Sequence, residues 1–366
     1  MAHVRKSASP KVTVWVGTRK GGFALRSNDR KRWDLDGPLF RGCEVNHVIQ
    51  DPRDPGIVYA SVTSWWFGTH LERSTDRGKT WRVSENGLEV KSLPETSLQR
   101  IWYIQPGHVE NRSTVWAGGE PGLIFRSDDW GQTWREVISL INHSTRSQWS
   151  PAMGSLSIHS IQCPAKGTII AGISVGGAFR SYDDGETWQP FNGNVRADFQ
   201  PKKNLEVGQC VHKLLIHPAD PKMLYQQNHC GVYRARWNAA KWTDVSRGLP
   251  TRFGFALALP AAEKQTLFTV PIESAEFRCN PEGKFRVACS RNGGKSWEFL
   301  TNGLPQRNAH LTVFRDAMSA DALSPAGVYV GTETGTLFYS RDSGRKWQVL
   351  AEYLPPIYSV SAYTEA

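Results

Sequence analysis

Four histidines recur close to the starts of predicted strands: His47, His159, His212 and His310. They stand in the segments NHVI, IHSI, VHKL and AHLT. Neutral imidazoles that converge from several strands bind divalent metals such as Zn, Fe or Mn. A metal-bound water could attack a substrate, or the metal could activate oxygen. Our leading hypothesis is therefore a metal-dependent hydrolase or oxygenase acting on a small molecule. The alternative is four separate histidines, each hydrogen-bonded at a strand end.

Three loop glutamates suggest a second chemistry, that of a metal-free glycoside hydrolase. This chemistry needs two carboxyl groups roughly 5 to 10 Å apart. Glu120, Glu273 and Glu333 could supply such a pair, and they are our candidate catalytic residues. The predicted substrate-binding side chains, which could stack on or bond to a saccharide or another small molecule, are Trp65, Trp66, Arg100, Trp102 and His229. The alternative is that the glutamates are only solvated loop residues.

Two long connections support a third hypothesis, a non-catalytic propeller that binds a protein. Residues 135–157 and 189–209 are long enough to form a rim around a binding surface. Binding residues are often carried on loops held by a rigid scaffold.

The elements that would position these residues are repeats of about 50 residues. Successive tryptophans are separated by 48, 53, 54, 54, 55 and 50 residues. Four strands of five or six residues fit into each period. The tryptophans that close the repeats are Trp33, Trp81, Trp134, Trp188, Trp242, Trp297 and Trp347.

A short hairpin sequence ends most repeats, as in RSDDWGQTW (residues 126–134) and RSYDDGETW (residues 180–188). The Asp side chain can accept backbone N–H bonds inside the turn, and Gly can adopt the positive φ that the turn needs. The Trp ring can be buried between neighbouring repeats. A group present in so many copies favours a structural role over a catalytic one.

These hairpins resemble the Asp-box, or BNR, repeat. It occurs in sialidases, xyloglucan-active glucanases, sortilin-type receptors and photosystem II assembly propellers. The resemblance implies a sialidase-like or sortilin-like β-propeller. Where sialidases carry Phe-Arg-Ile-Pro, this chain has FALR (residues 23–26), which argues against that activity. The xyloglucan enzymes use two propellers that face each other, whereas this chain is long enough for one.

We predict an all-β fold, a single seven-bladed propeller of four-stranded antiparallel blades over residues 11–366. Residues 1–10 are expected to be a flexible tail. Blade one begins at its second strand, residues 12–17, so a C-terminal strand at residues 357–363 should join it and close the ring. The hairpins then share one face, and the candidate histidines and glutamates share the opposite mouth of the channel.

Composition and charge limit the classes of partner that we expect. The net charge is +10, but the basic residues are spread over the repeats, so we expect no nucleic-acid partner. No apolar run approaches the length of a membrane span, and no membrane partner is expected. The polar N-terminus lacks the apolar core of a secretory signal, which favours a cytoplasmic location. The six cysteines are expected to be free thiols.

Overall fold

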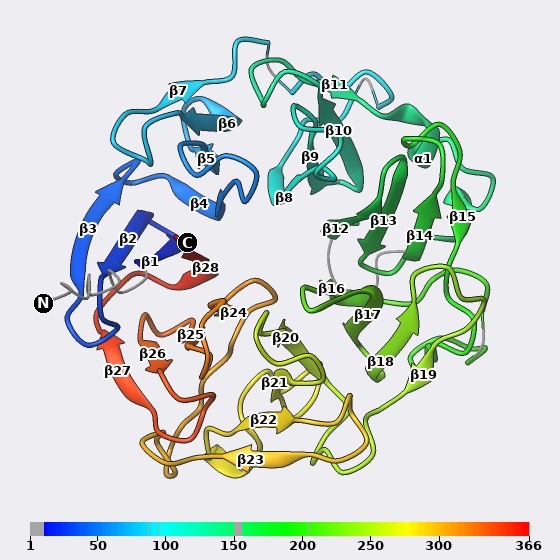
Figure 1. Cartoon of the computed structure of the whole chain (residues 1–366). Helices are drawn as coiled ribbons and strands as arrows, with labels where there is room; N and C mark the ends of the chain where they lie inside the picture. Colours follow the sequence, from blue (N-terminus) through cyan, green and yellow to red (C-terminus); the bar gives the residue numbers. More distant parts are fainter. Residues whose placement is uncertain (1–10, 87, 94, 150–155, 204, 366) are drawn as a thin grey trace, which may run out of the picture.

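The computed structural model describes residues 11–86, 88–93, 95–149, 156–203 and 205–365. Its seven four-stranded antiparallel sheets surround a central channel as the blades of a propeller (Figure 1). This confirms the predicted fold class and the predicted number of blades. The predicted tail, residues 1–10, lies outside the described residues.

The strands of each blade run from the channel outward in chain order, except in blade one. Blade one contains β28 (Ile357–Thr364), β1 (Val12–Thr18), β2 (Gly21–Ser27) and β3 (Asp34–Leu39). Blade two contains β4 (Glu44–Gln50), β5 (Val58–Ser64), β6 (Gly68–Ser74) and β7 (Arg82–Val83). Blade three contains β8 (Arg100–Pro106), β9 (Val115–Glu120), β10 (Leu123–Ser127) and β11 (Arg135–Glu136). Blade four contains β12 (Ile158–Ala165), β13 (Thr168–Ile173), β14 (Gly177–Ser181) and β15 (Gln189–Pro190).

The remaining blades have the same order. Blade five contains β16 (Val211–His217), β17 (Asp220–Asn228), β18 (Gly231–Arg236) and β19 (Thr243–Asp244). Blade six contains β20 (Gly254–Ala258), β21 (Leu267–Pro271), β22 (Val287–Ser290) and β23 (Glu298–Leu300). Blade seven contains β24 (Met318–Ala320), β25 (Val328–Gly331), β26 (Leu337–Ser340) and β27 (Gln348–Ala351). Helical structure in the described residues is limited to α1 (Ile138–Ile141) and the 3-10 turns Arg146–Gln148 and Pro281–Gly283.

The ring is closed by the last strand, as predicted. β28 pairs antiparallel with β1 along its whole length, from Val12 opposite Thr364 to Thr18 opposite Ile357. β28 is therefore the innermost strand of blade one (Figure 1). Because a closed ring leaves no unpaired edge between its first and last blades, this pairing protects the fold from edge-to-edge association.

The hairpins between the third and fourth strands have the bonding that their residues predict. In blade four, Asp183 Oδ1 accepts the backbone N–H of Thr187 at 2.9 Å. The Ser181 hydroxyl donates to Asp183 Oδ1 at 2.7 Å and accepts the Gly185 N–H at 2.9 Å. Gly185 has a φ of +88°, and a Cβ there would lie 3.3 Å from Trp116 of blade three. Each hairpin of this kind thus holds its own turn and packs on the preceding blade.

The hydrophobic core lies between neighbouring blades. One cluster joins Tyr103 and Trp116 of blade three to Ile158, Ile169 and Phe179 of blade four, and all five are buried. Aromatic and β-branched residues suit such surfaces because they fill the space between two twisted sheets. This packing holds the innermost strands in a fixed order around the channel.

Candidate functional site

A bulge recurs near the start of the innermost strands and re-aims one side chain in each. The pairing register skips Trp102 in β8, His159 in β12 and His212 in β16. In β4 the skipped residue is Asn46, and His47 follows it. A bulged residue is left out of the ladder and its side chain can be turned toward a site.

The bulged side chains of blades three, four and five line one cavity of 380 Å³, which we call the mouth cavity. It lies where the innermost strands begin, at the end of the blades opposite the Asp-box-like hairpins. Its volume is at the lower end of the range for small-molecule sites. Its further polar and aromatic lining includes Arg100, Glu120, Phe199, Cys210, His229, Phe253, Phe255, Glu276, Arg278 and Arg315.

One of the three predicted glutamates lines the mouth cavity. Glu120, at the end of β9, accepts a hydrogen bond from Trp102 Nε1 at 3.0 Å. Arg100 Nη1 lies 3.6 Å from the same carboxylate, whose side chain is 14% exposed. The hydrogen bond and the ion pair together fix the position of the Glu120 carboxyl group.

The other two predicted glutamates lie outside this cavity. Glu273 is exposed, and Glu333 is half-buried in the turn between β25 and β26. The cavity is instead reached by Glu276, which the sequence interpretation missed. Residues 274–279 form a tight turn, in which the Ser274 N–H donates to the Phe277 carbonyl oxygen, and this turn carries Glu276 to the rim. Its own backbone N–H and the Ser274 hydroxyl lower the pKa of Glu276, so it is ionised at neutral pH.

The structure does not bring the four predicted metal ligands together. His159 and His212 line the mouth cavity. His47 lies one layer deeper in the channel, because it stands one position after the bulge of its strand. His310 is exposed in the segment that precedes β24. The four rings would line one cavity only if each histidine stood at the bulge of its own strand. The spacing of residues in the sequence does not show where each bulge falls.

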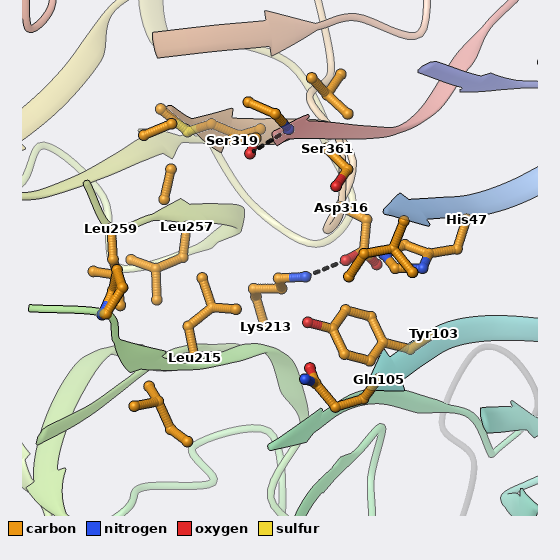
Figure 2. Close-up of a pocket in the computed structure, with 18 of the residues that line it drawn as sticks. His47, Tyr103, Gln105, Lys213, Leu215, Leu257, Leu259, Asp316, Ser319 and Ser361 are labelled. Atoms are coloured by element: carbon orange, nitrogen blue, oxygen red, sulfur yellow. Dashed lines mark hydrogen bonds and ion pairs between the residues drawn. The ribbon is translucent and has the colours of Figure 1, made fainter. Parts of the chain in front are cut away.

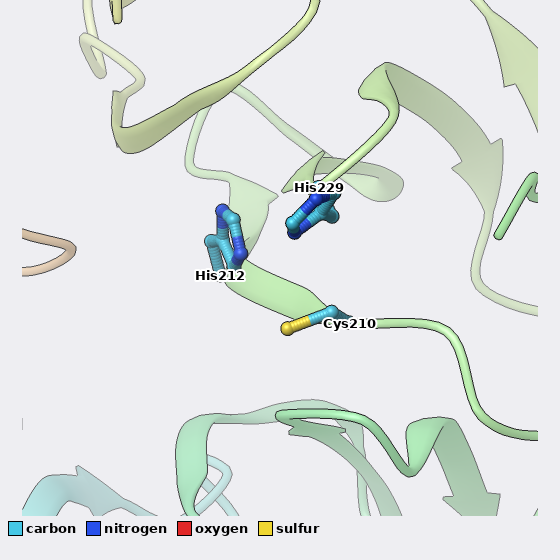
Figure 3. Close-up of side chains that lie close together, drawn as sticks. All are labelled: Cys210, His212 and His229. Atoms are coloured by element: carbon cyan, nitrogen blue, oxygen red, sulfur yellow. The ribbon is translucent and has the colours of Figure 1, made fainter. Parts of the chain in front are cut away.

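A different set of metal-ligand side chains does converge. Cys210, His212 and His229 offer donor atoms that all lie within 4.8 Å of one another (Figure 3). Cys210 directly precedes β16, which carries His212, and His229 follows β17. His229 was predicted as a substrate-binding residue, and Cys210 was not predicted at all.

The predicted aromatic residues divide between two places. Trp102 and Arg100 line the mouth cavity, as does His229. Trp65 and Trp66 are 95% and 86% exposed, and with Phe67 they border a separate surface hollow on blade two. They therefore do not line the mouth cavity.

Below the mouth cavity, the channel holds a second cavity of 330 Å³, which we call the channel cavity. Lys213 of β16 and Asp316, which precedes β24, form a buried ion pair that reaches across it (Figure 2). The Lys213 Nζ also lies 4.3 Å from the centre of the Tyr103 ring. Burial opposes the positive charge, but the Asp316 carboxylate outweighs it and raises the pKa of Lys213.

His47 faces the same cavity and is neutral. Its Nδ1 accepts the Ile104 N–H at 3.3 Å, and its ring packs against Tyr103 at 4.7 Å. Burial, followed by the charge of Lys213, lowers the pKa of His47 to about 3. An imidazole with so low a pKa does not act as an acid or base near neutral pH.

Comparison with known proteins finds xyloglucanases among the sequence relatives. The chain is 26% identical over 295 residues to a xyloglucanase from a Paenibacillus species, a match that covers 73% of this chain and 28% of the relative. An oligoxyloglucan-reducing end-specific xyloglucanase from Emericella nidulans is 22% identical over 334 residues. The chain spans about a third of the length of these relatives. No protein-family model matches it.

Solved structures share the fold. A GH74 enzyme from Niastella koreensis superposes with a TM-score of 0.61 at 16% identity, over 96% of this chain and 51% of the enzyme. YCF48 bound to a D1 peptide superposes with a TM-score of 0.50 at 16% identity, over 83% of this chain and 85% of the other. These likenesses show the propeller alone, since the same fold serves unrelated functions. No helix in the described residues is long and apolar enough to cross a membrane.

Proposed function

We propose that this chain is a glycoside hydrolase and that the mouth cavity is its active site. The observation that carries the proposal is that Glu120 and Glu276 line one cavity from opposite sides of the ring. Glu120 belongs to blade three and Glu276 to blade six, which face each other across the channel (Figure 1). Two carboxyl groups on either side of a scissile bond are the usual requirement of glycoside hydrolysis.

The surroundings of the two carboxyl groups suit different roles. Glu276 is ionised, and in the proposed reaction it acts as the base that activates water or as the nucleophile. Glu120 is the more enclosed of the two, and a bound saccharide removes its remaining contact with water. In this proposal the enclosed Glu120 serves as the general acid.

The aromatic and polar lining fits a saccharide. Trp102, Phe253 and Phe255 provide ring faces in the cavity wall, and sugar rings present apolar C–H faces that stack on them. Arg100 and Arg278 can donate hydrogen bonds to hydroxyl groups. The sequence relatives are xyloglucanases, which supports xyloglucan as the substrate class.

The test compares glutamates inside the cavity with glutamates outside it. Glu120→Gln and Glu276→Gln should each lower kcat/KM on xyloglucan oligosaccharides or chromogenic β-glucosides by about 100-fold or more. Glu273→Gln and Glu333→Gln serve as matched controls and should retain wild-type activity. If the wild-type chain hydrolyses none of these substrates, or if the two cavity variants remain active, the proposal is overturned.

A second candidate function, a non-catalytic propeller that binds a partner, is favoured by one exposed loop. Trp65, Trp66 and Phe67 are consecutive and 95%, 86% and 86% exposed. Contiguous exposed aromatics are unusual on a protein without a binding partner. In this case Trp65→Ala with Trp66→Ala would abolish partner binding, and the cavity variants Glu120→Gln and Glu276→Gln would not affect it.

A further inference from the structure

We propose that Cys210, His212 and His229 form a binding site for one Zn²⁺ ion at the wall of the mouth cavity. The site goes beyond the proposed hydrolase activity, which needs no metal. Three protein ligands with a fourth position left open are the arrangement of catalytic rather than structural zinc sites.

The three side chains come from two adjacent strands of blade five. Cys210 and His212 flank the first residue of β16, and His229 directly follows the end of β17, which pairs with β16. The pairing of Val211 with Asn228 sets their neighbouring positions. Their donor atoms lie within 4.8 Å of one another and turn toward a common point (Figure 3). Ligand atoms about 2.0 to 2.3 Å from a zinc ion lie somewhat closer together, so binding requires only side-chain adjustment.

The bonding of His212 leaves its Nε2 atom free for a metal. Its Nδ1 lies 2.7 Å from the Gly254 carbonyl oxygen, which can only accept a hydrogen bond. Nδ1 therefore carries the proton, and the lone pair of the neutral ring is on Nε2. A ring N–H donated to a backbone carbonyl is the usual outer support of a metal-binding histidine.

Aromatic rings enclose the second histidine. The His229 ring lies 4.6 Å from the Phe199 ring and 4.9 Å from the Phe253 ring. Burial lowers the pKa of His229, and burial also lowers the pKa of His212 well below its usual value.

Cys210 is buried beside an arginine in the wall of the mouth cavity. Burial raises the pKa of Cys210, and the nearby Arg315 guanidinium offsets this in part. Arg278 and Arg315 line the same cavity, and their positive charges favour hydroxide or another anion as the fourth ligand.

An unpartnered nitrogen lies in the same cavity wall. His159 is buried, and its Nδ1 has no hydrogen-bond partner among the described residues. Buried polar groups without a partner are uncommon, and such a group often marks the place of a missing water or ion. In this proposal His159 accepts a hydrogen bond from the water that completes the metal's coordination.

The experiment uses the purified full chain after treatment with a chelator, with Zn²⁺ and Co²⁺ as probes. We expect one Zn²⁺ per chain, and a thiolate-to-cobalt charge-transfer absorption when Co²⁺ binds. Cys210→Ser should remove that absorption. His229→Gln removes a direct ligand, so it should weaken Zn²⁺ binding by at least the roughly 100-fold that loss of an outer-sphere partner can cause. Cys43→Ser and His310→Gln, at sites away from the cavity, should change neither measurement.

The site is overturned if Zn²⁺ binding is not stoichiometric or is unaffected by both ligand variants. Should Cys210→Ser fail to fold, as judged by circular dichroism, the less buried His229→Gln decides the question. Hydrolysis is assayed separately. Zn²⁺ binding without hydrolysis supports this site and overturns the proposed function, whereas chelator-resistant hydrolysis without Zn²⁺ binding does the reverse.

Discussion

The two faces of this propeller differ in whether their residue types repeat from blade to blade. On the hairpin face, the same few residue types recur in blade after blade, and each copy makes the same local bonds. On the mouth face, the bulge position carries Asn46, Trp102, His159 and His212 in four successive blades. Repetition therefore marks the residues that hold the ring together, and its loss marks the residues available for chemistry.

The largest expected loss of stability comes from opening the ring, because the closing strand supports both faces. Deleting residues 356–366 removes β28, including the buried Ile357 and Val360. Burial of two such side chains contributes about 1.5 to 3 kcal/mol each, and the ladder to β1 is lost as well. We expect the melting temperature to fall by about 10 °C or more in a thermal melt followed by circular dichroism. An unchanged melt would mean that β28 does not close the ring.

The channel provides the sharpest challenge to the comparison, because the Lys213–Asp316 pair is not part of the repeated hairpin pattern and should still contribute much stability. Asp316→Ala leaves Lys213 buried without its partner, which costs about 3 to 5 kcal/mol. Chemical denaturation would measure this loss. The double variant Lys213→Met with Asp316→Leu should recover most of it, because it leaves no buried charge. If Asp316→Ala is as stable as the wild type, the ion pair is not a structural element.

Disturbing a single hairpin should reduce stability less. The loss can be separated into backbone strain and the contact with the preceding blade. Gly185→Ala imposes a left-handed backbone on a side chain and brings Cβ close to Trp116, so we expect a loss of about 1 to 2 kcal/mol in the free energy of unfolding. Gly42→Ala is the matched control, since Gly42 has a φ of +84° and open space around a Cβ. Equal losses in the two variants would show that the contact with Trp116 adds nothing.

The smallest expected effect is on the stability of the fold at acidic pH. Burial alone would raise the pKa of Asp183, but hydrogen bonds from the hydroxyl and backbone of Thr187 lower it. A carboxylate with a depressed pKa stabilises the fold above its unfolded pKa, near 4, and this contribution is lost as the pH falls further. Asp183→Asn with Asp129→Asn should therefore flatten the decline of melting temperature between pH 4 and pH 2, with little change at pH 7.

In the hairpin of blade six an asparagine, Asn292, already stands at the position of Asp183. Asn292 accepts the Ser296 N–H at 3.0 Å and the Ser290 hydroxyl at 2.9 Å, which are the bonds that Asp183 accepts in blade four. Asn292→Asp is thus the reverse control, and it should make the acid decline steeper. If the wild type and the Asp183→Asn, Asp129→Asn variant lose melting temperature equally between pH 4 and pH 2, the hairpin carboxylates do not cause that loss.

Some of the predicted site residues line one cavity and others lie apart from it, and for the histidines the reason is strand register. Trp102, His159 and His212 line the mouth cavity because each occupies the bulge near the start of an innermost strand. His47 was placed with them although it follows the bulge by one residue, and a one-residue shift turns a strand side chain in another direction. Glu276 and Cys210 were missed because neither repeats and neither lies in a recognisable motif. Their positions depend on a turn and on the pairing of two strands.

The sequence by itself determined the seven blades, the four-stranded pattern and the closing strand. Each of these follows from local bonds and from a period that is visible in the chain. Only the tertiary structure decided which side chains share a cavity, because residues of blades three to seven meet there across the ring. Contacts between blades depend on bulges and loop turns of single residues, and the repeat itself carries no information about them.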